Sequence, residues 1–136
     1  MLSIRQRNQQ SGMITEDTQL PVRILSCNEG KPTQYGTETL RFTFQHIASK
    51  EEFTSIVLEQ KGPDYIDDQI INAVLPPNVL DYSLEELSNL GLFVQVKFIT
   101  RGNNTFINVV KAEVLDEKHK QMLEELLSEE KHREMG

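Results

Sequence analysis

The stretch Thr39-Leu40-Arg41-Phe42-Thr43-Phe44-Gln45-His46 decides the fold. Between Leu40 and Phe44 every second side chain is apolar, and the side chains that separate them are polar or charged. Alternation with a period of two, bounded by turn residues, is typical of a β-strand that buries one face. We therefore predict a strand with its apolar and polar side chains on opposite faces. The residues predicted to be buried are Leu40, Phe42 and Phe44, and those predicted to be exposed are Arg41 and Thr43.

Four further strands are predicted around this one. Residues 20–25, 53–59, 93–100 and 105–110 contain the β-branched and aromatic residues that favour strands. The last two runs are joined by Arg101-Gly102-Asn103-Asn104, and Gly and Asn tolerate the positive φ of a hairpin turn. The first three strands are therefore expected to form a meander, and the last two a hairpin.

One short helix is predicted between the third and fourth strands. Ser83 and Glu86 form a capping box, and leucines follow at helical spacing. Gly91 is then expected to end the helix by taking the left-handed backbone conformation. Residues 61–82, which precede this helix, fit either a short helix or a strand, so their conformation is left open.

The predicted order of elements is β-β-β-α-β-β, which is the layout of a five-stranded OB-type barrel. The chain is thus expected to be mainly β, with the barrel in residues 20–115. A flat sheet with a packed helix is the alternative. Residues 1–19 are polar and aperiodic, which predicts a flexible N-terminal arm. Residues 116–136 predict an acidic, amphipathic C-terminal helix.

Length and composition exclude several classes of protein. A chain of 136 residues is about the size of one domain. Its apolar runs are too short to cross a bilayer, and its N-terminus lacks the apolar segment of a secretory signal. Cys27 is the single cysteine, which excludes an internal disulfide and fits a reducing cytoplasm. We therefore expect a cytoplasmic protein without a membrane partner.

Charge is unevenly distributed along the chain, whose net charge is −7. Residues 112–136 contain four basic and eight acidic side chains, whereas residues 21–111 contain eight basic and eleven acidic ones. In an OB-fold, ligands bind the face of strands two and three and the loops that join strands one to two and four to five. Four of the eight central basic residues fall in or beside that region, namely Lys31, Arg41, Lys97 and Arg101.

These basic residues predict a groove that binds single-stranded nucleic acid. In such grooves basic side chains follow the phosphates and aromatic side chains stack on the bases. Tyr35 is the predicted stacking residue, and Asn103 and Asn104 are predicted hydrogen-bonding partners. The alternative is that Tyr35 folds over the barrel mouth and that the basic residues only keep the strands soluble. The complete predicted set is Lys31, Tyr35, Arg41, Lys97, Arg101, Asn103 and Asn104.

Residues with catalytic or metal-binding chemistry are sparse. The three histidines lack the spacing of metal ligands. The carboxylates between Asp64 and Asp68 lack the spacing and the terminal Glu of an EF-hand loop. Neither a nucleophile elbow nor a phosphate-binding Gly motif is present. We therefore expect a binding module without metal or other cofactor, because no constellation supports an enzyme such as a small hydrolase.

The C-terminal helix is the predicted protein-binding segment. Its apolar residues Met122, Leu123, Leu126 and Leu127 stand among charged ones and would pack on a partner helix or on a second copy of the chain. This segment supports a second hypothesis, an acidic protein-interaction module that acts as an accessory or inhibitor protein. Such a module would dock on a basic partner.

The segment Gly30-Lys31-Pro32-Thr33-Gln34-Tyr35-Gly36-Thr37-Glu38-Thr39-Leu40-Arg41-Phe42-Thr43-Phe44 resembles the first hairpin of small OB-fold proteins of phages and mobile elements. The similarity extends loosely through Gly91-Leu92-Phe93-Val94-Gln95-Val96 to the last hairpin. Many of those proteins bind single-stranded DNA. The resemblance therefore implies an accessory protein of replication or recombination whose partner is single-stranded DNA.

Overall fold

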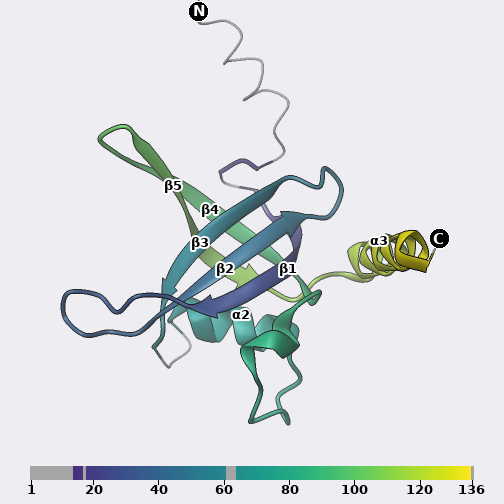
Figure 1. The fold of residues 1–136 in the computed structure, drawn as a ribbon, viewed down its shortest axis with the longest axis horizontal. Helices are drawn as coiled ribbons and strands as arrows, with labels where there is room; N and C mark the ends of the chain where they lie inside the picture. Colours follow the sequence, from purple (N-terminus) through teal and green to yellow (C-terminus); the bar gives the residue numbers. More distant parts are fainter. Residues whose placement is uncertain (1–13, 17, 61–63, 136) are drawn as a thin grey trace, which may run out of the picture.

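The computed structural model describes residues 14–16, 18–60 and 64–135, and Figure 1 shows how their elements are arranged. The elements are β1 (Leu20–Glu29), β2 (Thr39–His46), β3 (Glu52–Leu58), α2 (Ile66–Val74), the 3-10 helix η1 (Leu84–Leu87), β4 (Gly91–Arg101), β5 (Asn104–Glu113) and α3 (Glu117–Met135). Of the predicted flexible arm, residues 1–13 and 17 lie outside the described residues, as do residues 61–63.

The five strands form one antiparallel sheet with the order β3-β2-β1-β4-β5. β1 is the central strand: Ile24 is paired with Phe44 of β2, and Val22 with Leu92 of β4. The first three strands form the predicted meander and the last two the predicted hairpin. The prediction of a mainly β fold with a C-terminal helix is confirmed.

The side chains of β2 confirm the predicted buried face, whereas the opposite face is fully exposed only at Arg41. Leu40, Phe42 and Phe44 are at most 4% exposed, and Arg41 on the opposite face is exposed. The rings of Phe42 and Phe44 stack with their centroids 5.5 Å apart. Thr43, predicted to be exposed, is half-buried, and its hydroxyl oxygen lies 3.3 Å from that of Thr54 in the neighbouring strand.

The sheet curls until its two edge strands touch. The backbone N–H of Val109 in β5 donates a hydrogen bond of 3.2 Å to the buried hydroxyl of Ser55 in β3. Irregular pairing at Leu25 in β1 and at Val110 in β5 contributes to the curl, since an extra residue bends a strand. No backbone ladder joins the described residues of β3 and β5, so the sheet is curled but not closed.

The helix between β3 and β4 is α2, in the region whose conformation the sequence left open. It packs against one end of the curled sheet, below it in Figure 1, where Ile70 is fully buried in the main core. The side-chain oxygen of Gln69 accepts a hydrogen bond of 3.3 Å from the backbone of Ala112 in β5. α2 therefore covers the end of the core that the strands leave open.

The helix predicted to start at Ser83 is shorter than expected and is the 3-10 turn η1. Ser83 caps it, because its hydroxyl accepts a hydrogen bond of 3.3 Å from the backbone of Glu86. The left-handed residue after it is Asn89, with a φ of 70°, so the prediction that Gly91 takes this conformation was wrong. The helix ends early because the chain after it hydrogen-bonds to β1. The backbone N–H of Asn89 donates to the carbonyl oxygen of Ile24, and the backbone N–H of Ile24 donates to the carbonyl oxygen of Leu90.

Gly91 is required for packing rather than for its backbone conformation. A Cβ atom at this position would lie 2.7 Å from Leu123 Cδ2 and 2.8 Å from Leu115 Cδ2. Leu123 belongs to α3, which packs its leucines on the side of the sheet in a second cluster with Ile47. Figure 1 shows α3 at the right-hand side of the sheet.

Candidate functional site

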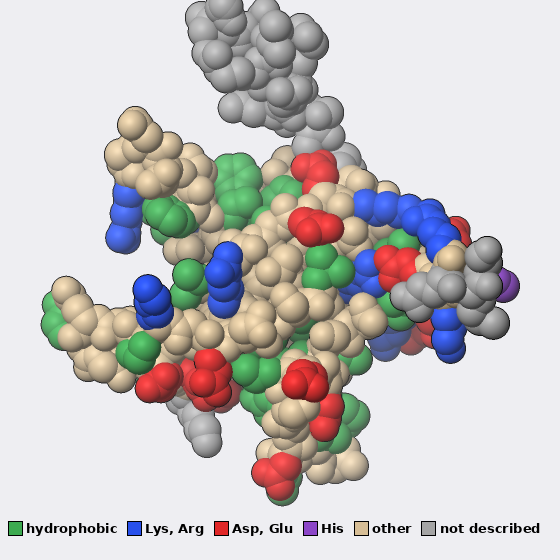
Figure 2. All heavy atoms as spheres, in the orientation of Figure 1, with side chains coloured by type: hydrophobic (Ala, Val, Ile, Leu, Met, Phe, Trp, Pro, Cys, Tyr) green, Lys and Arg blue, Asp and Glu red, His purple; other side chains and the backbone are tan. Residues whose placement is uncertain are grey.

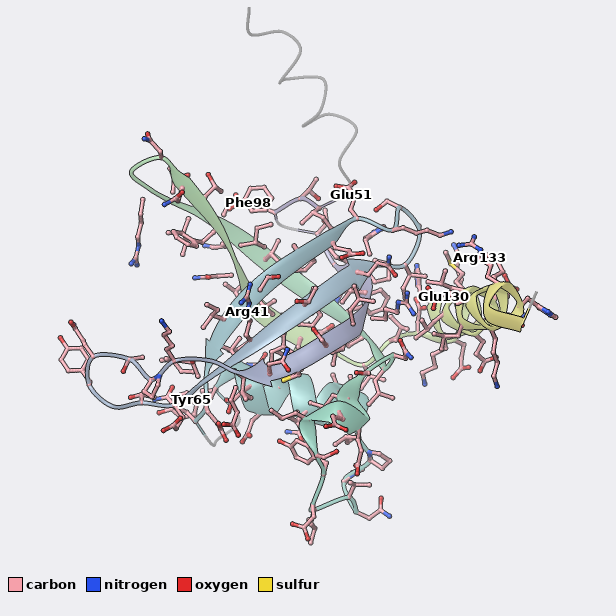
Figure 3. The ribbon with its side chains drawn as sticks, in the orientation of Figure 1. Arg41, Glu51, Tyr65, Phe98, Glu130 and Arg133 are labelled. Atoms are coloured by element: carbon pink, nitrogen blue, oxygen red, sulfur yellow. The ribbon has the colours of Figure 1, made fainter. Side chains whose placement is uncertain are left out.

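A groove of about 420 Å³ lies between the outer face of β2 and β3 and the hairpin of β4 and β5. The strand register brings its residues together, because Arg41 is paired with Ile56 and Ile99 with Phe106. In Figure 3 Arg41 lies on the outer face of β2. The first wall is formed by Arg41, Thr54 and Ile56, and the second by Ile99, Arg101, Phe106, Ile107 and Asn108.

The hairpin that carries the second wall is shaped by its turn. β4 ends at Arg101 and β5 begins at Asn104, so Gly102 and Asn103 form a two-residue loop. Gly102 has a φ of 62°, whereas Asn103 is not among the described residues with positive φ. This is the pattern of a type II′ turn, whose twist matches that of the flanking strands. The turn places Arg101 at the outer end of the groove.

Two guanidinium groups, those of Arg41 and Arg101, flank the groove. Within the described part of the chain neither forms an ion pair with a carboxylate. Figure 2 shows Lys and Arg side chains on the left-hand side of the molecule, over the β1–β2 loop, β2 and the β4–β5 hairpin. Acidic side chains lie below them in this view. The two free guanidinium groups are thus available to an anionic ligand.

Between the two arginines the groove has an apolar surface. Phe106 is 50% exposed and Ile56 is 60% exposed, and both line the groove. An exposed ring beside two free cations is the combination that stacks on a nucleic-acid base. Sequence reasoning missed Phe106, although one signal was present. Ile107 and Val109 carry the apolar alternation of β5, which turns Phe106, the residue before them, outward.

The β1–β2 loop projects on the same side of the molecule as the β4–β5 hairpin (Figure 1). Thr33 Oγ1 accepts hydrogen bonds from the backbones of Tyr35 and Thr37, which shape the loop, and Gly36 has a φ of 84°. Tyr35 is 86% exposed at its tip. Its ring therefore does not fold over the core as the alternative prediction had it.

The other predicted nucleic-acid-binding residues lie outside the groove lining. Lys31 is exposed in the β1–β2 loop, and Asn103 and Asn104 are exposed in the hairpin turn. Lys97 is exposed on β4, where it is paired with Asn108. The structure thus brings two of the seven predicted residues, Arg41 and Arg101, into one groove.

The predicted protein-binding residues of α3 contact the domain itself. Leu123 and Leu126 are each 7% exposed and share a cluster with Ile47 and Leu115. Met122 and Leu127 are half-buried against the same cluster. Leu123 and Leu126 are therefore covered by the domain itself, whereas Met122 and Leu127 remain partly exposed.

The titratable groups with altered pKa values do not line the groove. Burial raises the pKa of the Cys27 thiol to about 12, which keeps this thiol protonated and unreactive. Burial lowers the pKa of His46 and raises the pKa of Asp67. Within the described ranges, no three His, Cys, Asp or Glu side chains are placed to hold a metal ion.

Comparison with known proteins found neither a matching family model nor a similar curated protein. Among the described helices none is long and apolar enough to span a membrane.

Proposed function

We propose that this protein is a non-enzymatic module that binds single-stranded nucleic acid in the groove between β2–β3 and the β4–β5 hairpin. The observation that carries the proposal is the half-exposed ring of Phe106 beside the unpaired guanidinium groups of Arg41 and Arg101. The ring offers a stacking surface, and the two cations offer contacts to successive phosphates. The proposal includes the replication or recombination role that the resemblance implies.

The proposal also assigns the fold to the OB class. Support comes from the pairing of β1 with both β2 and β4, from the contact of β3 with β5, and from the position of α2 between β3 and β4. OB-folds bind oligonucleotides on the face of strands two and three and on the loops after strands one and four. The groove and the β1–β2 loop occupy these positions here.

A single strand fits the groove better than a duplex, because a base can stack on Phe106 only when it is unpaired. Stacking on one aromatic side chain contributes about 1–3 kcal/mol. Each phosphate contact on a single strand changes the slope of log K against log salt by about −0.7. With Arg41 and Arg101 in the groove and Lys31 in the β1–β2 loop as contacts, we expect a shallow slope of about −2.

The test is fluorescence anisotropy of a labelled single-stranded DNA of about 12 nucleotides, a length within the range that one OB domain covers. Phe106→Ala should weaken binding by about 1–3 kcal/mol. The matched control is Phe98→Ala, because Phe98 is a 41% exposed ring of the same hairpin that does not line the groove (Figure 3). Equal losses in the two variants would contradict the stacking role.

The cationic part of the groove is tested by the salt dependence. Arg41→Ala and Arg101→Ala should each remove about 0.7 from the salt slope. Arg133→Ala removes the same charge from α3, which lies across the molecule from Arg41 in Figure 3, and should leave the slope unchanged. If the native protein binds neither single-stranded DNA nor RNA at low salt, the proposal fails.

The exposed carboxylates of α3 favour a second candidate function, the acidic protein-interaction module. Glu124, Glu125 and Glu129 are exposed on this helix, whose leucines face the domain. A basic partner protein could dock on this surface without displacing α3. Loss of such an interaction in a variant with the three glutamates replaced by glutamine would support this candidate.

A further inference from the structure

A second hollow of about 300 Å³ continues the groove along the contact between β3 and β5. Ile56 and Asn108 line both hollows, so the two adjoin each other. Arg101 lines the first hollow, and Tyr65, at the start of α2, lines the second. In Figure 3 Tyr65 lies beyond the lower end of β3, and Arg41 lies higher on the face of β2. A strand bound along both hollows would pass from Phe106 to Tyr65.

The walls of the second hollow differ in chemistry from those of the first. Tyr65 is 43% exposed, and its ring stands beside the exposed apolar side chains of Leu58 and Val110. The polar groups are the amides of Gln60 and Asn108 and the carboxylate of Asp64. Among the described residues that line the second hollow, only Asp64 has a charged side chain. A carboxylate repels a phosphate, whereas an aromatic ring with polar neighbours suits a nucleobase.

We propose that the second hollow is a base-recognition subsite that prefers cytosine over thymine or uracil. An ionised carboxylate accepts hydrogen bonds and donates none. Cytosine presents an amino donor at the position where thymine and uracil present a carbonyl oxygen. Asp64 can therefore pair with the amino group of cytosine but repels the carbonyl oxygen of thymine. The inference rests on the proposed function and adds a base preference to it.

Comparison of cytosine with thymine gives the sharpest test, because both are single-ring bases of similar size. Anisotropy is measured for labelled dC and dT strands of about 12 nucleotides at slightly alkaline pH and low salt. The native protein should bind the dC strand about three- to tenfold more tightly, the usual effect of one net hydrogen bond.

Asp64→Asn should bring the ratio of the dC and dT affinities close to one. The asparagine amide accepts from cytosine and also donates to thymine, so it no longer discriminates. Asp81→Asn is the matched control: Asp81 is exposed, lines neither hollow, and loses the same charge. This control variant should keep the native ratio. If Asp64→Asn changes the affinities for the dC and dT strands by the same factor, the effect reflects only the loss of a negative charge, and the base preference is overturned.

Tyr65→Leu and Tyr65→Phe test the stacking part of the subsite. Leucine should weaken binding of the dC strand, and phenylalanine should restore it because the ring suffices for stacking. Equal binding of the two strands by the native protein, or an unchanged ratio in Asp64→Asn, overturns the base preference while the proposed function stands. If neither strand binds, the proposed function has failed and the subsite fails with it.

Discussion

Replacing Glu130 by alanine tests whether α3 is fixed to the sheet through Arg23. Arg23 is 4% exposed, and its guanidinium donates to both carboxylate oxygens of Glu130, over 2.8 and 2.5 Å. The same group also donates to the side-chain oxygens of Gln45 and Asn89, over 2.8 and 3.1 Å. Glu130 is thus the ionic partner in a network that joins β1, β2, the turn before β4 and α3.

The size of the effect follows from the two lost hydrogen bonds and from the exposure of Glu130. A hydrogen bond to a charged group contributes about 1.5–3 kcal/mol to stability. The Glu130 side chain is 39% exposed, so water replaces part of what the carboxylate provided. We therefore expect the free energy of unfolding to fall by about 1–3 kcal/mol, which is less than the sum for two bonds.

Urea denaturation followed by far-ultraviolet circular dichroism measures this loss. Glu129→Ala is the matched control, because Glu129 is the adjacent exposed glutamate of the same helix. This control variant should change stability by no more than about 0.5 kcal/mol. If Glu130→Ala and Glu129→Ala have equal stabilities, the ion pair does not fix α3, and the reasoning is refuted.

The pH dependence of the same pair has a definite sign. The hydrogen bonds from Arg23 hold the pKa of Glu130 below its ordinary value of 4.5. A lowered carboxyl pKa contributes stability above the ordinary pKa, and this contribution is lost as the pH falls through the folded-state pKa. The difference in stability between the native protein and Glu130→Ala should therefore shrink below about pH 4.5.

Two further predictions concern the buried polar groups Ser55 and His46. Ser55→Ala should cost about 1–3 kcal/mol, because the backbone N–H of Val109 loses its buried acceptor; a cost equal to that of Thr54→Ala, an exposed neighbour, would contradict this. Burial lowers the pKa of His46 below 6.5, so stability should fall as the pH drops below that value. His46→Asn keeps an acceptor for the backbone of Ser49 and should show a flatter pH dependence in the same urea titrations. If the stability of His46→Asn depends on pH as steeply as that of the native protein, the pH dependence comes from groups other than His46.

The strands and turns were predictable because their signals are local. A period of two from Leu40 to Phe44 specifies which side chains face the core, whichever strands lie beside them. Gly102 could be assigned to a hairpin turn for a similar reason, since few residues tolerate its positive φ. Arg41 and Arg101 were predicted to share a groove only after an OB layout had been assumed.

The fine structure of the groove was less predictable. The exposure of Phe106 has a local signal, because the alternation of Ile107 and Val109 turns the preceding ring outward, but its place in one groove with Arg41 depends on how the hairpin lies against β2 and β3. The second hollow depends on the approach of β3 to β5, which the contact between Ser55 and Val109 maintains. Neither the position of the hairpin against β2 and β3 nor the approach of β3 to β5 is encoded in a short window of sequence.

The sequence by itself determined where the strands lie along the chain, which of their side chains face the core and which residues form the hairpin turn. These features depend on neighbours within a few positions. Only the tertiary structure decided where α3 packs and what holds it there. Arg23 and Glu130 are 107 positions apart in the sequence. The leucines of α3 pack on Ile47 and against the space left by Gly91, which are also distant in the sequence. Such contacts depend on the whole curled sheet, since the matching surface does not exist until β1, β2 and β4 are paired.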